Sequence, residues 1–136
     1  MTMTPCSNKP WMSAMLYAAA VYNLLYGALV IFFPMLLFRW AGMPLPNYPE
    51  IFQCLGMVVG VYGVGYAIAA TNPTRHWPIV FVGLLGKFLG PIGFIHSALT
   101  GRLPWIAGWM NVTNDLIWWI PFTLVLIAAY RQRDIA

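Results

Sequence analysis

The chain has 136 residues, a length that accommodates one domain. Hydrophobic residues make up 61% of it and charged residues 7%, against about 25% charged in typical soluble domains. This composition excludes an ordinary soluble protein. The formal net charge of +4 is spread along the chain without a basic cluster, so nucleic-acid binding is not expected.

Four apolar stretches each meet the roughly 20-residue length of a transmembrane helix. They predict an all-α, four-helix transmembrane bundle of up-down-up-down order, as a single integral membrane domain over residues 1–136. The helices are expected at about residues 11–33, 50–71, 76–99 and 104–130. Residues 35–40, after Pro34, predict a short interfacial helical segment following the first helix. Aromatic residues lie near the ends of these stretches, as in interfacial belts: Trp11, Trp40, Tyr48, Trp77, Trp105 and Tyr130.

Two glycine patterns share the same spacing: Gly56, Gly60 and Gly63 in the second helix, and Gly86, Gly90 and Gly93 in the third. Small residues at this spacing let transmembrane helices approach closely. The pattern predicts a packing interface between the second and third helices, and a dimer interface is the alternative.

Lys87 and Asp115 lie in the middle of apolar stretches, whereas the other eight charged residues lie in tails, loops or helix ends. A charge near the bilayer centre costs roughly 2.5–3.5 kcal/mol on insertion scales, so it is normally paired and marks a functional site. Lys87 follows His76 by 11 residues and Asp115 follows Pro104 by 11, about 16 Å along each helix. Because the third and fourth helices are antiparallel, the two charges are expected to meet near the midplane.

Further polar residues are expected near this pair. Asn23 reaches the same depth on the first helix, and Asn111 shares a helical face with Asp115. Pro91 leaves a backbone carbonyl near residue 87 without its helical partner. Glu50 and His96 are expected nearer the outer surface. The candidate ligand-binding residues are Lys87, Asp115, Asn111, Asn114, Asn23, Gln53, Glu50, His96 and Trp118.

A purely structural interpretation stays open, because a Lys–Asp pair can serve only to fix helix register. The convergence of polar groups from all four helices at one depth favours a site instead. The sequence contains no cofactor motif, and no metal site is expected because His76 and His96 lie at opposite ends of one helix. The lack of a CxxC motif argues against a dithiol redox centre.

Four short sequence motifs resemble those of a known family: residues 52–57 (FQCLGM), 75–78 (RHWP), 83–87 (GLLGK) and 114–122 (NDLIWWIPF). Over roughly residues 20–125 they resemble a set of uncharacterised small four-helix bacterial membrane proteins, some of which carry an alkyl hydroperoxide reductase label. More loosely, four short helices with a core polar patch and a lysine in a glycine-rich helix resemble the DoxX-like group. The resemblance implies a small bacterial membrane protein of four helices and brings no established function.

The leading hypothesis is a small inner-membrane protein that binds a hydrophobic or amphipathic small molecule, quinone- or lipid-like, at the intramembrane polar residues. A Lys–Asp pair there can support proton-transfer or redox chemistry. The first alternative is an accessory or assembly subunit of a larger membrane complex, or a homo-oligomer. The second alternative is a proton-coupled transporter that uses Asp115 as carrier.

Loop charges predict a bacterial inner-membrane protein with both termini in the cytoplasm. One side carries Lys9, Arg75, Arg131 and Arg133, and the other carries Arg39 and Arg102. The side richer in Lys and Arg normally stays inside. A cytoplasm-specific reporter fused after residue 136 should therefore be active, and activity of a periplasm-specific reporter there would contradict the orientation.

Overall fold

The computed structural model of the chain describes residues 9–133, most of which are helical and none of which forms a strand. Three long helices are continuous: α1 (Pro10–Phe32), α3 (Pro49–Thr71) and α4 (Trp77–Leu99). The fourth span covers Trp105–Gln132. A short helix, α2 (Leu36–Trp40), follows α1 as expected. The all-α four-helix bundle predicted from hydropathy is therefore confirmed.

The fourth span is not the single regular helix that its apolar pattern predicts. It begins as a 3₁₀ turn, η1 (Trp105–Ala107), and continues as α5 (Gly108–Asn111). A π-helical turn, η2 (Val112–Leu116), comes next and is followed by α6 (Ile117–Arg133). Single π turns inside α-helices are rare and are frequently found at functional sites. Asp115 lies within this one.

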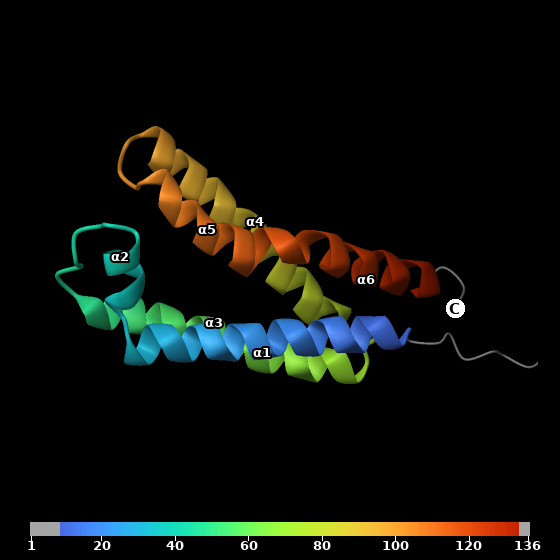
Figure 1. Cartoon of the computed structure of the whole chain (residues 1–136). Coiled ribbons are helices and arrows are strands. Elements are labelled where there is room, and N and C mark those ends of the chain that lie inside the picture. Colours follow the sequence, from blue (N-terminus) through green and yellow to red (C-terminus); the bar gives the residue numbers. More distant parts are fainter. Residues whose placement is uncertain (1–8, 134–136) are drawn as a thin grey trace, which may run out of the picture.

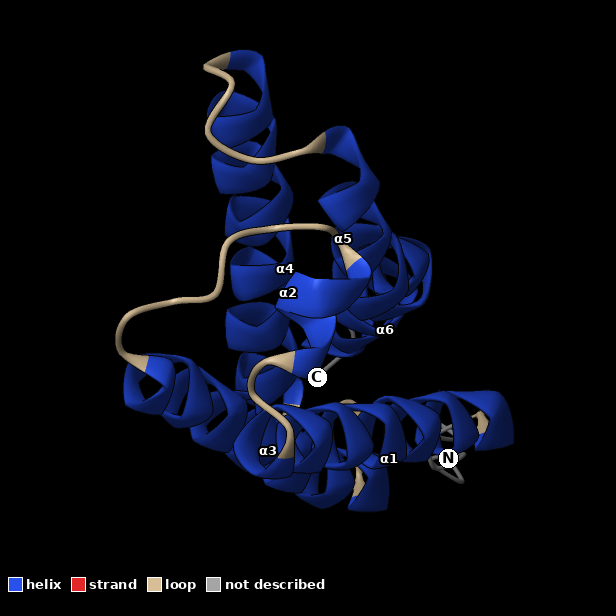
Figure 2. Cartoon of the chain, turned by 60° about the vertical axis from the view of Figure 1, so that its left-hand side comes forward, coloured by secondary structure: helices blue, strands red, loops and turns tan. Residues whose placement is uncertain are grey.

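The helices form two pairs (Figure 1). α1 packs along α3, and α4 packs along the fourth span. The pairs diverge toward the end at which α2 lies, and Figure 2 shows α2 between them. Phe38 of α2 contacts Phe52 of α3 edge to face, with ring centroids 4.9 Å apart. α2 thus covers the wider end of the space between the pairs.

Glycines allow α1 and α3 to pack closely. A Cβ atom at Gly27 would lie 2.6 Å from the carbonyl oxygen of Gly56, and one at Gly63 would lie 3.0 Å from that of Ala20. The predicted glycine interface between α3 and α4 is therefore wrong. Gly56 and Gly63 face α1, and the Cβ position of Gly86 is open. Glycine spacing identifies a face of small residues, but it does not say which helix lies against that face.

The pairs meet through aromatic residues at the narrower end. Tyr66 of α3 is fully buried and packs edge to face on Phe122 of α6, with centroids 5.0 Å apart. A Cβ atom at Gly83 would lie 2.5 Å from the Tyr66 ring, so this glycine lets α4 approach α3. Burial of large aromatic side chains is a major stabilising contribution in such cores.

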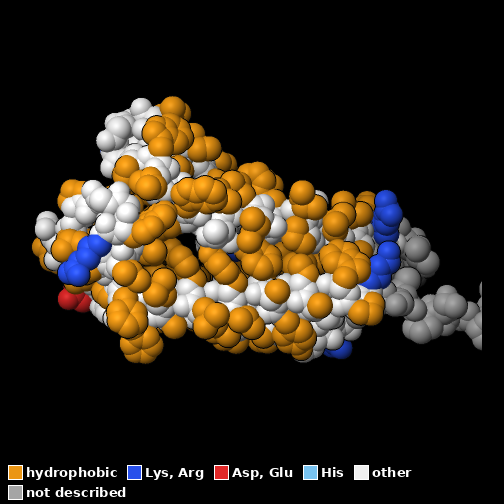
Figure 3. Space-filling model, in the orientation of Figure 1, with side chains coloured by type: hydrophobic (Ala, Val, Ile, Leu, Met, Phe, Trp, Pro, Cys, Tyr) orange, Lys and Arg blue, Asp and Glu red, His pale blue; other side chains and the backbone are white. Residues whose placement is uncertain are grey.

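The surface is that of a multi-pass membrane protein. Figure 3 shows hydrophobic side chains along the length of both pairs, and Lys and Arg side chains gathered at the two ends. The four spans are all long and apolar enough to cross a bilayer. Exposed aromatic side chains, including Trp40, Tyr48 and Tyr130, lie near the span ends, where interfacial belts form.

Gly27→Ala should destabilise the protein, because the added Cβ would lie 2.6 Å from a backbone oxygen that cannot move without parting the helices. Overpacking of this kind typically costs about 1–3 kcal/mol. Gly60→Ala is the matched control, since its Cβ position is open and alanine favours the helix. SDS-induced unfolding from mild detergent measures both. Equal effects of the two substitutions would show that α1 and α3 do not pack through Gly27.

Candidate functional site

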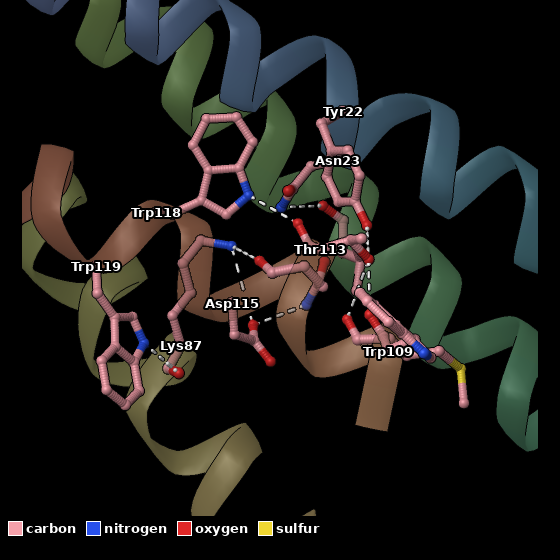
Figure 4. A network of polar contacts seen from close by, with 11 residues as sticks. Tyr22, Asn23, Lys87, Trp109, Thr113, Asp115, Trp118 and Trp119 are labelled. Atoms are coloured by element: carbon pink, nitrogen blue, oxygen red, sulfur yellow. Dashed lines mark hydrogen bonds and ion pairs between the residues drawn. The ribbon is translucent and has the colours of Figure 1, made fainter. Parts of the chain in front are cut away.

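Lys87 and Asp115 meet between α4 and η2, as expected from their depth. The Lys87 Nζ atom lies 4.0 Å from Asp115 Oδ1, and both residues are more than nine-tenths buried. Figure 4 shows the two side chains pointing toward one another, with Asn23 and Tyr22 reaching in from α1. Because charges in an apolar interior need partners, this pair determines how the surrounding residues are arranged.

The structure makes room for the carboxylate at Gly90. A Cβ atom there would lie 2.8 Å from Asp115 Oδ2, so any larger side chain would displace it. The carboxylate also accepts a hydrogen bond from Asn114 Nδ2 at 2.8 Å. Asp115 is therefore held from two sides, by the bare backbone of α4 and by its neighbour in η2.

The π turn supplies a further partner for the ammonium. Lys87 Nζ donates a hydrogen bond to the backbone carbonyl oxygen of Asn114. The same turn leaves the Thr113 carbonyl to accept from Trp118 Nε1 at 3.1 Å. Two backbone oxygens of η2 thus accept from side chains, one from the lysine and one from the indole.

On α4, Pro91 likewise allows a backbone carbonyl to accept from a side chain. Proline has no N–H, so the carbonyl of Lys87, four residues earlier, loses its helical donor. Trp119 Nε1 donates to that oxygen at 2.9 Å. The Trp119 ring also stacks on Phe88, with centroids 4.2 Å apart. The acceptor predicted from Pro91 is therefore present and is used to join α4 to α6.

Three aromatic rings surround the lysine ammonium. Lys87 Nζ lies 5.7 Å from the ring centroid of Tyr66, 5.9 Å from that of Phe122 and 6.0 Å from that of Trp118. A cation within about 6 Å of an aromatic face is stabilised, most strongly where water is excluded. The ammonium is thus held by one carbonyl, one carboxylate and the three rings.

Asn23 of α1 brings an acceptor that has no partner. The residue is 3% exposed, and its Nδ2 donates to the Val59 carbonyl oxygen at 3.3 Å. In the described part of the chain, two buried side-chain polar atoms lack a hydrogen-bond partner, Asn23 Oδ1 and Asn114 Oδ1. Buried polar atoms are normally satisfied, so each such atom calls for a specific explanation.

Both asparagines line a cavity of 170 Å³ next to the ion pair, hereafter the polar cavity. Its lining comes from α1, α3, α4 and η2: Asn23, Val58, Val59, Tyr62, Tyr66, Gly83, Gly86, Lys87, Asn114 and Asp115. Val58 and Gly86 are also exposed on the outer surface. The polar cavity is thus bordered by residues that reach the outer surface of α3 and α4.

A second, larger cavity of 360 Å³ lies between the pairs under α2, hereafter the apolar cavity. Its lining includes Tyr26, Phe38, Phe52 and Phe94. Gly90 and Asn111 also line it, and a Cβ atom at Gly90 would lie 2.8 Å from Asp115 Oδ2 and 3.7 Å from Asn111 Oδ1. The Asp115 carboxylate thus lies between the polar and the apolar cavity.

The residues around Lys87 and Asp115 are hereafter the polar cluster. The structure does not bring all candidate residues to it. Gln53 donates from Nε2 to the Ile31 carbonyl at 2.7 Å and so satisfies the last turn of α1. Glu50 is exposed in the first turn of α3, and His96 is exposed in the last turn of α4. Asn111 faces the apolar cavity, and Trp118 covers the lysine.

Other residues of the cluster carry no charge and were not singled out from the sequence. Tyr22 of α1 donates from its hydroxyl to Thr113 Oγ1 at 3.0 Å, and Thr113 donates to the Trp109 carbonyl at 3.1 Å. Tyr66 lines the polar cavity and faces the ammonium. Tyr22 lies one position from Asn23, so the depth argument that selected Asn23 applies to it as well.

Comparison with protein families, curated proteins and solved structures finds no match to this chain. A fold alone does not determine a function. The function must therefore follow from the chemistry of the cluster itself.

Lys87→Met or Asp115→Asn alone should destabilise the protein by about 3–5 kcal/mol, because each leaves a buried group without its partner. The double variant should recover part of that loss. Exposed Glu50→Gln serves as the control for removing a charge and should change stability by less than about 1 kcal/mol. SDS-induced unfolding measures all four variants. Strictly additive losses in the double variant would contradict the pairing.

Trp119→Phe should cost about 1–3 kcal/mol, because it keeps the ring on Phe88 but leaves the Lys87 carbonyl without a donor. Pro91→Ala restores an N–H that can donate to the same carbonyl within the helix. The cost of Trp119→Phe should therefore be smaller in the Pro91→Ala background. Trp109→Phe, at an exposed position, controls for loss of an indole. An equal cost in both backgrounds would contradict this bonding scheme.

Proposed function

We propose that this multi-pass membrane protein binds a hydrophobic or amphipathic small molecule, quinone- or lipid-like, with its polar end in the polar cavity. The observation that carries the proposal is Asn23, which is buried and has an unpartnered oxygen beside an ion pair and an open cavity. A pair that only fixed helix register would need neither the cavity nor the extra acceptor.

The size of the polar cavity favours a bound head group over a whole ligand. Pockets that enclose drug-sized ligands measure about 300–1,000 Å³, and this one measures 170 Å³. A molecule with its head in this space keeps its tail outside it. Val58 and Gly86 line the polar cavity and are also exposed on the outer surface, and Gly90, which contacts the same carboxylate, lines the apolar cavity. Both surroundings suit a hydrocarbon tail.

The ion pair also supplies an acid and a base beside the cavity, which is the minimum that proton transfer to a bound molecule requires. Lys87 and Asp115 would then act on the head group while Asn23 and Asn114 orient it. The proposed setting is a bacterial inner membrane with both termini in the cytoplasm. The loop charges and the resemblance to small bacterial membrane proteins support this location.

A substitution that fills the polar cavity should release the ligand. At Gly86 a side chain would enter open space, so Gly86→Val should narrow the cavity without a clash. Gly60→Val is the matched control, because its Cβ position is also open and it does not line this cavity. Organic extracts of protein purified in mild detergent should contain one small molecule in the wild type and in Gly60→Val. In Gly86→Val its amount should fall at least about tenfold, with thermal stability unchanged.

The result that would overturn the proposal is an extract of the wild type that holds nothing beyond the lipids carried by an unrelated membrane protein. Equal ligand content in Gly86→Val would also overturn it, because binding would then lie elsewhere. Co-purification with a defined set of other chains would favour the accessory-subunit alternative. Proton-dependent solute uptake in proteoliposomes would favour the transporter.

A further inference from the structure

We propose that an anionic phospholipid occupies a groove between α4 and α6, at the end of the bundle where α6 ends, with its phosphate on Arg131. The groove measures 470 Å³ and is hereafter the lipid groove. It shares no lining residue with the polar or the apolar cavity, so it is a separate site. The inference does not depend on the ligand proposed for the polar cavity.

The lipid groove runs from the membrane surface into the apolar part of the bundle. On α6, Thr123, Ile127 and Arg131 line it at intervals of four residues, so they share a helical face. They extend over about 12 Å of the helix axis at 1.5 Å per residue. Arg131 lies at the end of the fourth span, and Thr123 lies deeper. Across the groove, Trp77 is the first residue of α4 and Phe81 lies one turn further in.

The deeper part of the lipid groove offers apolar contacts. Its walls there include Phe81, Leu126 and Ile127. The hydroxyl of Thr123 donates to the Trp119 carbonyl at 2.7 Å, so its polar atom is engaged within its own helix. This part of the groove suits a hydrocarbon chain and gives a water-soluble anion nothing to bind.

The outer end of the lipid groove carries a cation without a partner. Arg131 is exposed, and it forms no ion pair with any residue of the described range 9–133. A guanidinium presents its N–H donors in a planar fork that matches the oxygens of a phosphate. Trp77 and Tyr130 line the groove at the same end, and aromatic residues at this level of a bilayer lie among the lipid head groups. The groove thus combines a phosphate-binding end with an apolar end.

The surrounding charge favours a head group that is negative overall. In the sequence, four basic residues fall on this side of the membrane against one acidic residue: Lys9, Arg75, Arg131 and Arg133 against Asp134. Figure 3 shows Lys and Arg side chains gathered at this end. A zwitterionic head group would bring its own cation among them, whereas an anionic one would not. A second groove of 540 Å³, beside α2, has no charged residue in its lining and so has no means of selecting charge.

The test is native mass spectrometry of delipidated protein in mild detergent, titrated with phosphatidylglycerol or with phosphatidylcholine of identical acyl chains. Wild-type protein should bind phosphatidylglycerol about fivefold or more tightly, which is the effect of one basic residue near an anionic surface. Arg131→Gln should remove most of this preference. Arg39→Gln is the matched control, because Arg39 is an exposed arginine on α2 at the other end and should leave the preference unchanged. Ile127→Trp should weaken the binding of both lipids by filling the groove.

Equal binding of the two lipids to the wild type would overturn the proposal. Loss of the preference in both arginine variants would overturn it as well, because the attraction would then come from the charge of the whole protein. Unchanged binding in Ile127→Trp would place the lipid outside the groove. A dimer that forms without lipid and is lost in Ile127→Trp would assign the groove to a second copy of the chain. The three substituted side chains are exposed, and thermal unfolding checks that each variant folds.

Discussion

The constraint on which the structure depends is that a lysine and an aspartate inside apolar helices must find all their partners within the protein. Three irregularities of the backbone meet this need at one depth. Gly90 gives the Asp115 carboxylate room against α4, and Pro91 leaves a carbonyl for Trp119. The π turn η2 presents the Asn114 carbonyl to the ammonium. Each of these would weaken an isolated helix, and together they hold α4 against the fourth span.

The two helix pairs are held together by different means. α1 and α3 pack through small residues, with the backbone at Gly27 close to that at Gly56. α4 and α6 are joined by polar contacts and stacked rings, such as Trp119 on Phe88. The two pairs touch where Tyr66 meets Phe122 and Gly83, and where Tyr22 meets Thr113. The space left between them forms the polar and apolar cavities.

Hydropathy was sufficient to predict the four spans, because the bilayer sets their length. The short helix was predicted from the residues that follow Pro34. The cost of buried charge was sufficient to predict that Lys87 and Asp115 meet. The π turn could not be predicted, since nothing in the apolar pattern of residues 112–116 separates it from an α-helix. The glycine partners were assigned wrongly, because spacing along α3 does not encode which neighbour lies against it. Gln53 was expected near Lys87 and Asp115 only because it is polar. Its side-chain amide instead donates to the Ile31 carbonyl oxygen in the last turn of α1.

A structural role and a binding role for the ion pair make different demands on the first helix. To fix the register of α4 against α6, the pair needs only residues of those two spans, and the Asn114 carbonyl and the rings supply them. Asn23 lies on α1, across the polar cavity, and its oxygen satisfies nothing in the described chain. Burying an amide oxygen without a partner is costly, and an apolar side chain at this position would avoid that cost. Asn23, and not the charged pair itself, is therefore the residue that a purely structural role leaves unexplained.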